Sequence, residues 1–358
     1  MVVVLVSLAA CVPPRAPKRD SGVSVADAGV PIIFSIGVTD SASVSHQVAA
    51  FINLELENGS PSTDTVLSRR VLVPPVLDGV DSEWAAIAGS QIPLEPAAAT
   101  IGMTVDEWNT GYGLLADGGL RPYDFGVDHV LVKSAFDDST IYFLIEWNDA
   151  TASTAKNSLT FTNGGWVRNT DEEDRLYLSF DVSYPDFAAL GCAAACHLRE
   201  RLDDNTDAGI QYRIRMHTNG PGEVADVWSW GSVATNPISY ADDLSFTQYN
   251  RTNDDARGFS TSNRKNVSDG GIEPISMSEY GVNSNPSVLY APDSGLHPAA
   301  VPYNPTGLDA GARIPGVVHQ IAGGSRADVH AVGKWRNGTW TVELARARVT
   351  ADPNDARF

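Results

Sequence analysis

The chain has 358 residues, of which 44 are Asp or Glu and 25 are Lys or Arg, so its formal net charge at neutral pH is −19. This acidity excludes a nonspecific nucleic-acid binder, because contact with phosphates requires a surface rich in Lys and Arg. A hydrophobic content of 43% excludes general disorder, and three cysteines are too few for a disulfide-rich miniature fold.

The first eleven residues resemble a bacterial lipoprotein signal that ends in Leu8-Ala9-Ala10-Cys11, although basic residues do not precede the apolar stretch. This stretch is too short to span a bilayer, which requires about 20 residues. We therefore expect residues 1–11 to direct export and Cys11 to receive a lipid. The protein would be periplasmic or anchored to the outer membrane, with the lipid as its only membrane contact. The alternative is a buried apolar N-terminus with an incidental cysteine.

Residues 12–70 differ in composition from the rest of the chain. Pro13, Pro14 and Pro17 follow the first cysteine, and stretches containing Ser, Asp and Gly come next. Such a composition predicts a tether between the membrane and a folded domain. Residues 31–57 are more apolar, and they would pair as an extra strand or form a short helix. The main domain is then expected over residues 71–358.

From residue 71 onward, short β-like runs alternate with turns. The runs lie at residues 130–136, 141–147, 175–181 and 211–216, followed by a hairpin over 335–344. The Asn337-Gly338 pair in that hairpin is a strong two-residue turn signal. Helical periodicity is short and confined to residues near 81–88 and 186–197. This pattern predicts an all-β fold, a β-sandwich with short helices and long loops. Residues 250–315 are expected to form a long loop that covers a site.

The densest chemical signal is the segment Gly191-Cys192-Ala193-Ala194-Ala195-Cys196-His197. The two thiols are four residues apart, which places them on one face if the segment is helical. A histidine directly after a cysteine is typical of c-type haem attachment, but there the cysteines are separated by two residues and here by three. The spacing leaves three alternatives open: a local disulfide, covalent haem, or another metal or redox role.

Further candidates lie between residues 216 and 230. Met216 is a possible iron ligand, although a single Met on a strand is also a common core residue. Trp228 and Trp230 are two residues apart, so on a strand they would form a flat aromatic wall that could stack on a porphyrin or a sugar. The alternative for this pair is an ordinary position in the core or on a sheet face.

A set of short motifs follows in a fixed order along residues 71–358. In chain order they are Leu77-Asp78-Gly79 with Trp84, Ile141-Tyr142-Phe143 with Glu146-Trp147-Asn148-Asp149, Glu173-Asp174-Arg175, Phe187 with Gly191-Cys192 and Cys196-His197, Asp226-Val227-Trp228-Ser229-Trp230, Ile314-Pro315-Gly316, Ser325-Arg326-Ala327-Asp328-Val329, and Trp335, Gly338 and Trp340 with Glu343-Leu344. This ordered set resembles the ethylbenzene dehydrogenase gamma-subunit family, also described as the cytochrome c/dimethyl sulfoxide reductase-like haem-binding domain.

The resemblance implies a sandwich of carbohydrate-binding-module-like topology that holds one haem, b-type in preference to c-type, near one end. It also implies axial ligation by a methionine and a lysine. Met216 is the leading methionine, and His197 and Lys334 are further metal-ligand candidates. The resemblance departs at Ser229, where relatives carry His, and at Gly231, where many carry Lys. Relatives also continue past Phe358, so one edge strand is expected to be missing.

The resulting hypothesis is an exported haem-binding electron-transfer domain without catalytic activity, similar to the haem b subunit of periplasmic molybdenum oxidoreductases. Its acidity suggests a redox partner with a basic docking face. The alternative is a lipoprotein module that binds carbohydrates or surfaces without haem. A third hypothesis, motivated by Ser229 and Gly231, is a structural subunit whose haem site has been lost.

Overall fold

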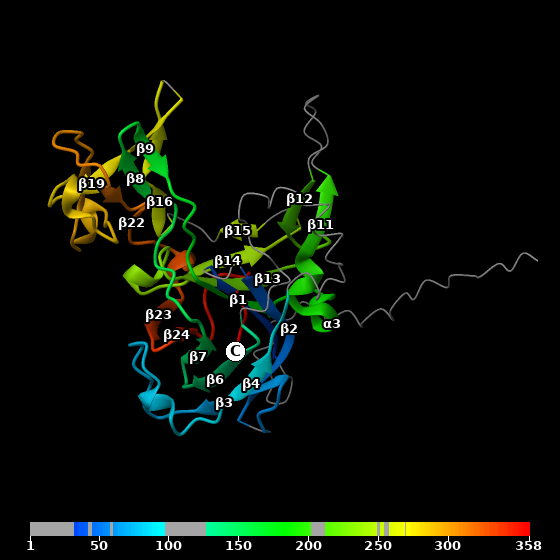
Figure 1. The fold of residues 1–358 in the computed structure, drawn as a ribbon. Coiled ribbons are helices and arrows are strands. Elements are labelled where there is room, and N and C mark those ends of the chain that lie inside the picture. The colour runs from blue at the N-terminus through cyan, green and yellow to red at the C-terminus, as the bar shows by residue number, and fades with distance from the viewer. Residues whose placement is uncertain are drawn as a thin grey trace, which may run out of the picture.

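Strands account for nearly all of the regular structure in this protein. The computed structural model describes residues 32–41, 45–57, 60–96, 127–201, 212–248, 251–253, 258–268 and 270–358. Over these ranges the one α-helix is α3 (Phe187–Leu190), and the other helical pieces are short 3-10 turns (Figure 1). None of the helices in the described part of the chain has the length and apolar character needed to cross a bilayer. The predicted all-β class, a β-sandwich with few helices, is confirmed.

A curled sheet of 13 strands forms the main body. Its continuous path runs β15-β14-β13-β10-β1-β2-β3-β6-β7-β24-β23, with β4 attached to β6 and β5 attached to β2. Most neighbours are antiparallel, but β3 is parallel to both β2 and β6. The strands are β1 (Ile32–Asp40), β2 (Ser45–Leu56), β3 (Thr65–Arg70), β4 (Ser90–Pro93), β5 (Glu95–Pro96), β6 (His129–Phe136), β7 (Thr140–Asn148), β10 (Arg175–Asp181), β13 (Ala225–Gly231), β14 (Asp242–Phe246), β15 (Arg251–Asn253), β23 (His330–Arg336) and β24 (Thr339–Ala347).

The apolar runs of the sequence form strands that are buried on both faces. On β7, Phe143, Ile145 and Trp147 belong to the main core, whereas Tyr142 and Leu144 face a second apolar cluster under the 3-10 turn η1 (Ser82–Trp84). A strand covered on both faces needs apolar residues at every position, which explains the unbroken run. The predicted runs at 130–136, 141–147 and 175–181 therefore correspond to β6, β7 and β10.

The curled sheet closes through a side-chain contact between β13 and β23, which lie near its two ends. The Trp230 ring on β13 packs against Gly333 on β23, where an added Cβ would lie 2.3 Å from the ring. Tyr240 and His330 form an isolated backbone bridge beside this contact. The curled sheet therefore encloses one core, and Gly333 is required because the indole ring occupies the space of a side chain.

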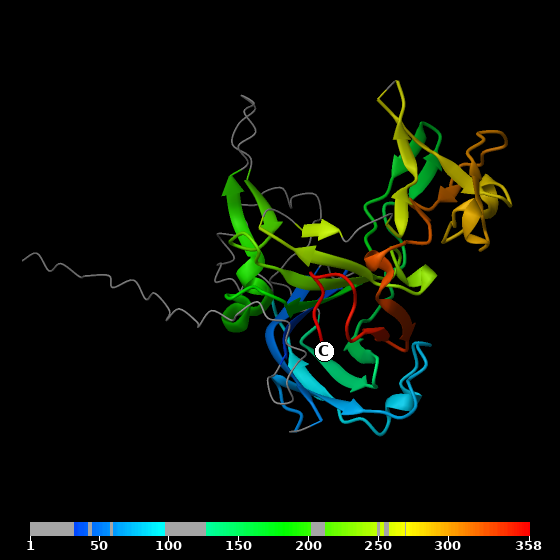
Figure 2. The ribbon, with the colours of Figure 1, turned by 180° about the vertical axis from the view of Figure 1, so that it is seen from behind.

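A smaller lobe projects from the main body (Figures 1 and 2). The chain enters it between β7 and β10 and again between β15 and β23, and its own apolar core includes Leu159, Trp166, Leu289 and Ile314. Its strands are β8 (Leu159–Thr162), β9 (Gly165–Arg168), β16 (Ser260–Ser262), β17 (Arg264–Asn266), β18 (Ile272–Pro274), β19 (Ser276–Ser278), β20 (Ala300–Pro302), β21 (Arg313–Ile314) and β22 (Val317–His319). The expectation of a long loop over 250–315 was wrong, because two- and three-residue strands are too short to give a periodic sequence signal.

The tether predicted for residues 12–70 is not observed over the described part of that range. Strands β1, β2 and β3 lie in the interior of the main sheet, and Phe34, Ile36 and Val38 are fully buried. The alternative of an extra strand within 31–57 is confirmed. A domain boundary at residue 71 would therefore separate three central strands from the sheet that they complete. Residues 1–31, with Cys11, lie outside the described residues.

The helix expected over residues 186–197 is much shorter than predicted. After α3, the chain continues as the 3-10 helix η3 (Gly191–Ala195) and then as strand β11 (Cys196–Arg201), which pairs with β12 (Tyr212–Met216). Gly191 at the C-cap has a φ of 55°, a conformation that glycine adopts readily and that ends the helix. Cys192 and Cys196 therefore lie in different elements and do not share one face of a helix.

Candidate functional site

The segment from α3 to β12 brings several of the predicted ligands together. In the β11–β12 hairpin, Cys196 is the register partner of Met216. The fold thus makes backbone neighbours of two sulfur-containing residues that are distant in sequence. Met216 is half-buried against an apolar cluster that includes Tyr184, Phe187 and Ala195.

Cys192 lies beside this cluster and is a free cysteine. Its backbone N–H donates a hydrogen bond of 2.8 Å to the Ser35 hydroxyl on β1. Burial raises the pKa of the Cys192 thiol to about 11. The thiol is therefore protonated at neutral pH, whereas the nucleophilic form of cysteine is the thiolate. The side chain of Cys196 lies outside the described ones, and Cys192 forms no disulfide.

The other two metal-ligand candidates are not beside Met216. His197 occupies the next register position of β11, where its partner is Arg215 and not Met216. Lys334 lies on β23, with its Cγ 2.7 Å from the position that a Cβ on Gly79 would take. Figures 1 and 2 show β23 and β12 on different sides of the main body. The fold thus brings Met216 to Cys196 but keeps Lys334 away from both.

Trp228 and Trp230 point the same way on β13, as their spacing predicts, but they point into the core. Both side chains are fully buried. The Trp228 ring lies 4.8 Å from the ring of Phe180, and the Trp230 ring lies 5.1 Å from that of Trp340. The structure corrects the expectation of an accessible aromatic wall, because residues of the main core pack against both side chains and bury them. The carbohydrate-binding alternative loses the exposed tryptophan pair on which it depended.

Met216 and its apolar neighbours match part of the donor set that a haem requires. A haem needs an apolar bed for the porphyrin and a soft or imidazole ligand for the iron. Met216 supplies a thioether at the margin of the apolar cluster formed by Tyr184 and Phe187. A cavity of about 140 Å³ within the smaller lobe does not fit, because its lining of Asn157, Arg168, Arg264 and several Ser and Thr residues is polar.

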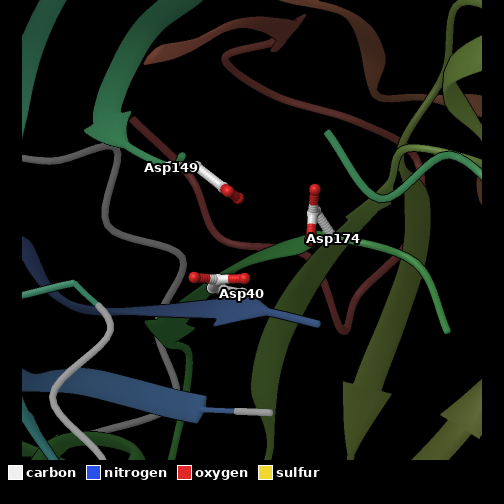
Figure 3. Close-up of side chains that lie close together, drawn as sticks. All are labelled: Asp40, Asp149 and Asp174. Carbon is white, nitrogen blue, oxygen red and sulfur yellow. The ribbon is translucent and has the colours of Figure 1, made fainter. Parts of the chain in front are cut away.

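Two clusters of three buried carboxylates are also present, and the sequence pattern did not single them out as sites. One consists of Asp226, Asp243 and Asp355 and surrounds Arg346. The other consists of Asp40, Asp149 and Asp174 (Figure 3).

In the second cluster, two pKa values are raised. Burial, and then the charge of Asp174, raises the pKa of Asp149 to about 7, and burial raises the pKa of Asp174 above its usual range. The available signal was that Asp149 ends one of the motifs quoted above and Asp174 lies in the middle of another. Asp40 carried no signal, because it lies in the segment interpreted as a tether.

The family assignment follows from comparison with known proteins. No curated protein was found to match the sequence. The sequence model of the family described as Ethylbenzene dehydrogenase matches residues 81–358, which is more than three quarters of the chain. This range contains α3, the β11–β12 hairpin and the two tryptophans of β13. The chain therefore belongs to the ethylbenzene dehydrogenase family.

Proposed function

We propose that this protein is a non-catalytic haem-binding subunit that transfers electrons within a molybdenum oxidoreductase of the ethylbenzene dehydrogenase type. The observation that carries the proposal is the position of Met216, half-buried on an apolar bed and register partner of Cys196, inside the range that matches the family. A bound haem would supply one-electron transfer. The protein's own contribution is the ligand, the apolar bed and the shielding from water.

A noncovalent b-type haem is proposed in preference to a c-type haem. Covalent attachment requires two reactive thiols, and the Cys192 thiol has a raised pKa and lies in a different element from Cys196. Met216 is the proposed axial ligand. Because His197 pairs in register with Arg215 and Lys334 lies on β23, neither is assigned as its partner at the same iron.

We also propose a location for the protein in the cell. Lipidation at Cys11 would make the protein an exported lipoprotein, periplasmic or held at the outer membrane by the lipid. The formal charge of −19 supports encounter with a redox partner that has a basic docking face, because opposite charges accelerate association.

Haem reconstitution of the full chain tests this function. We expect a Soret band after haem addition and gel filtration, and a loss of at least ten-fold in haem affinity for Met216→Leu, which removes the thioether and keeps the volume. Met277→Leu is the matched control, because Met277 packs in the core of the smaller lobe. A Soret band that Met216→Leu leaves unchanged would refute the ligand assignment. The absence of any Soret band in the folded wild-type chain would refute the haem function.

A further inference from the structure

Three aspartates converge where the smaller lobe joins the main body. Asp40 is the last residue of β1, Asp149 follows β7, and Asp174 precedes β10. One carboxylate oxygen from each lies within 4.8 Å of the others. Their exposed fractions are 7%, 3% and 0%, respectively, so three acidic groups share a small volume that is nearly closed to solvent. Figure 3 shows the three side chains directed toward a common centre.

One oxygen at this centre accepts no hydrogen bond from an N–H or hydroxyl group of the described residues. The Oδ1 atom of Asp149 accepts a hydrogen bond of 3.0 Å from the Thr151 N–H, but its Oδ2 atom is buried and makes no hydrogen bond to the described residues. A buried carboxylate oxygen without a partner is costly, because it loses its hydration without compensation. Figure 3 shows the Asp149 carboxylate pointing toward Asp40 and Asp174.

The neighbouring carboxylate of Asp174 is held firmly in place. Its Oδ1 atom accepts the Ser41 N–H at 3.0 Å, and its Oδ2 atom accepts the Ser153 N–H at 2.6 Å and the Trp340 indole N–H at 3.0 Å. These donors orient the group but carry no formal charge. Within the part of the chain that the structure describes, no lysine or arginine forms an ion pair with Asp149 or Asp174.

The other buried acidic cluster differs in its charged neighbours. Asp226, Asp243 and Asp355 surround the guanidinium group of Arg346, which lies 2.7 Å, 3.3 Å and 3.7 Å from their respective oxygens. There the chain provides the compensating cation itself. The cluster of Asp40, Asp149 and Asp174 has the same number of carboxylates, and none of the lysines and arginines that the structure describes pairs with Asp149 or Asp174.

We propose that Asp40, Asp149 and Asp174 form a binding site for a divalent cation with a preference for oxygen ligands, namely Ca²⁺. Calcium takes six to eight oxygens at about 2.3–2.6 Å, so oxygens on opposite sides of the ion are about 5 Å apart, consistent with this cluster. The three carboxylates supply between three and six oxygens, and water completes the shell. The unpartnered Asp149 Oδ2 becomes a ligand.

An ion at this position would link two distant points of the chain to the main sheet. Asp149 and Asp174 are the two ends of the segment that leaves the main sheet after β7, forms β8 and β9, and returns at β10. Asp40 belongs to the central strand β1. An ion bound by all three would fasten both ends of this excursion to the main body. The inference is independent of the haem site and goes beyond the proposed function.

Calcium titration of the full chain after chelation of bound metals tests the site. We expect one Ca²⁺ per chain by calorimetry and a rise in the unfolding temperature on Ca²⁺ addition. Asp149→Asn should weaken Ca²⁺ binding at least ten-fold and abolish the rise. Without metal, this variant should unfold at the same temperature as the wild type or higher, because it removes one of three like charges.

The control variant is Asp138→Asn, which changes an exposed aspartate paired with Arg70 on the surface and should bind Ca²⁺ as the wild type does. Two results would overturn the proposal: a folded wild-type chain that neither binds Ca²⁺ nor gains stability from it, or an Asp149→Asn variant with wild-type affinity. The haem test uses Soret absorbance, so failure of one proposal is separable from failure of the other.

Discussion

Arg346 is fully buried and lies among three aspartates and two aromatic rings. Its Nη1 atom pairs with Asp226 and Asp243, and its guanidinium carbon lies 4.7 Å from the centroid of the Trp228 ring. These contacts link β24 to β13 and β14. The Nη2 atom of Arg346 also donates a hydrogen bond of 2.6 Å to the Ala356 carbonyl, which joins the C-terminal segment to the same cluster. A buried ion pair contributes little net stability, but removing one partner leaves uncompensated charge.

We therefore expect Arg346→Met to destabilise the fold by about 3–5 kcal/mol, since the loss of a buried cation leaves three carboxylates without compensation. Urea unfolding measures this change in the free energy of unfolding. Arg348→Met is the control, because Arg348 is only partly buried and donates mainly to backbone carbonyls. Equal losses in the two variants would contradict the special role of the buried cluster.

The same cluster gives a pH dependence with a definite sign. Burial raises the pKa of Asp355 to about 6, although Arg346 opposes this shift. The folded state therefore binds a proton more tightly than the unfolded state. The resulting contribution to stability is complete below the unfolded pKa of about 4 and is lost as the pH rises through about 6.

We expect the free energy of unfolding to fall more steeply between pH 4 and pH 6 in the wild type than in Asp355→Asn, by at most about 3 kcal/mol. Chemical denaturation at a series of pH values measures both slopes, and the other titrating groups are common to the two proteins. If the free energy of unfolding changed with pH equally in the two proteins, Asp355 would not titrate as proposed.

At the scale of elements, the family motifs are explained by contacts between distant strands. Glu343 on β24 accepts hydrogen bonds from the backbone N–H groups of Asp78 and Gly79 and from the Trp84 indole, at 2.8, 2.6 and 2.7 Å. Glu173 likewise accepts the Val233 N–H at 3.0 Å. These motif residues fix loops onto the sheet, so their contacts in this chain serve the fold.

The contact between β13 and β23, which closes the curled sheet, can be tested by mutation. Gly333→Ala should destabilise the protein by about 1–3 kcal/mol, because its Cβ would overlap the Trp230 ring, which is buried and has no room to move. Thermal or urea unfolding measures the effect. Gly323→Ala is the matched control, since a Cβ at that position meets nothing within 4 Å. A Gly333→Ala variant as stable as this control would contradict the packing described at the closure.

The whole molecule consists of a main sandwich and a smaller lobe joined by several crossings of the chain. The proposed haem site lies at the α3–β12 side of the sandwich, and the proposed calcium site lies where the lobe begins (Figure 1). The two proposals thus concern different regions, one for electron transfer and one for the attachment of the lobe. This separation is why a failure of calcium binding would leave the haem hypothesis untouched.

The sequence by itself determined features that depend on local order. The runs that became β6, β7 and β10 and the hairpin turn were all predictable, and Asn337 and Gly338 do have positive φ values of 51° and 84°. The ordered motifs also indicated the family, and the family model matches residues 81–358. Short strands such as β16 to β20 escaped prediction, since three residues are too few to establish a period.

Only the tertiary structure decided which residues meet and which are accessible. It placed Trp228 and Trp230 inside the core, made Cys196 the register partner of Met216, and gathered Asp40 with Asp149 and Asp174. Spacing along a strand predicts the direction of a side chain relative to its neighbours, but not what covers that face. Burial and convergence depend on how distant segments pack, and that information is distributed over the whole chain.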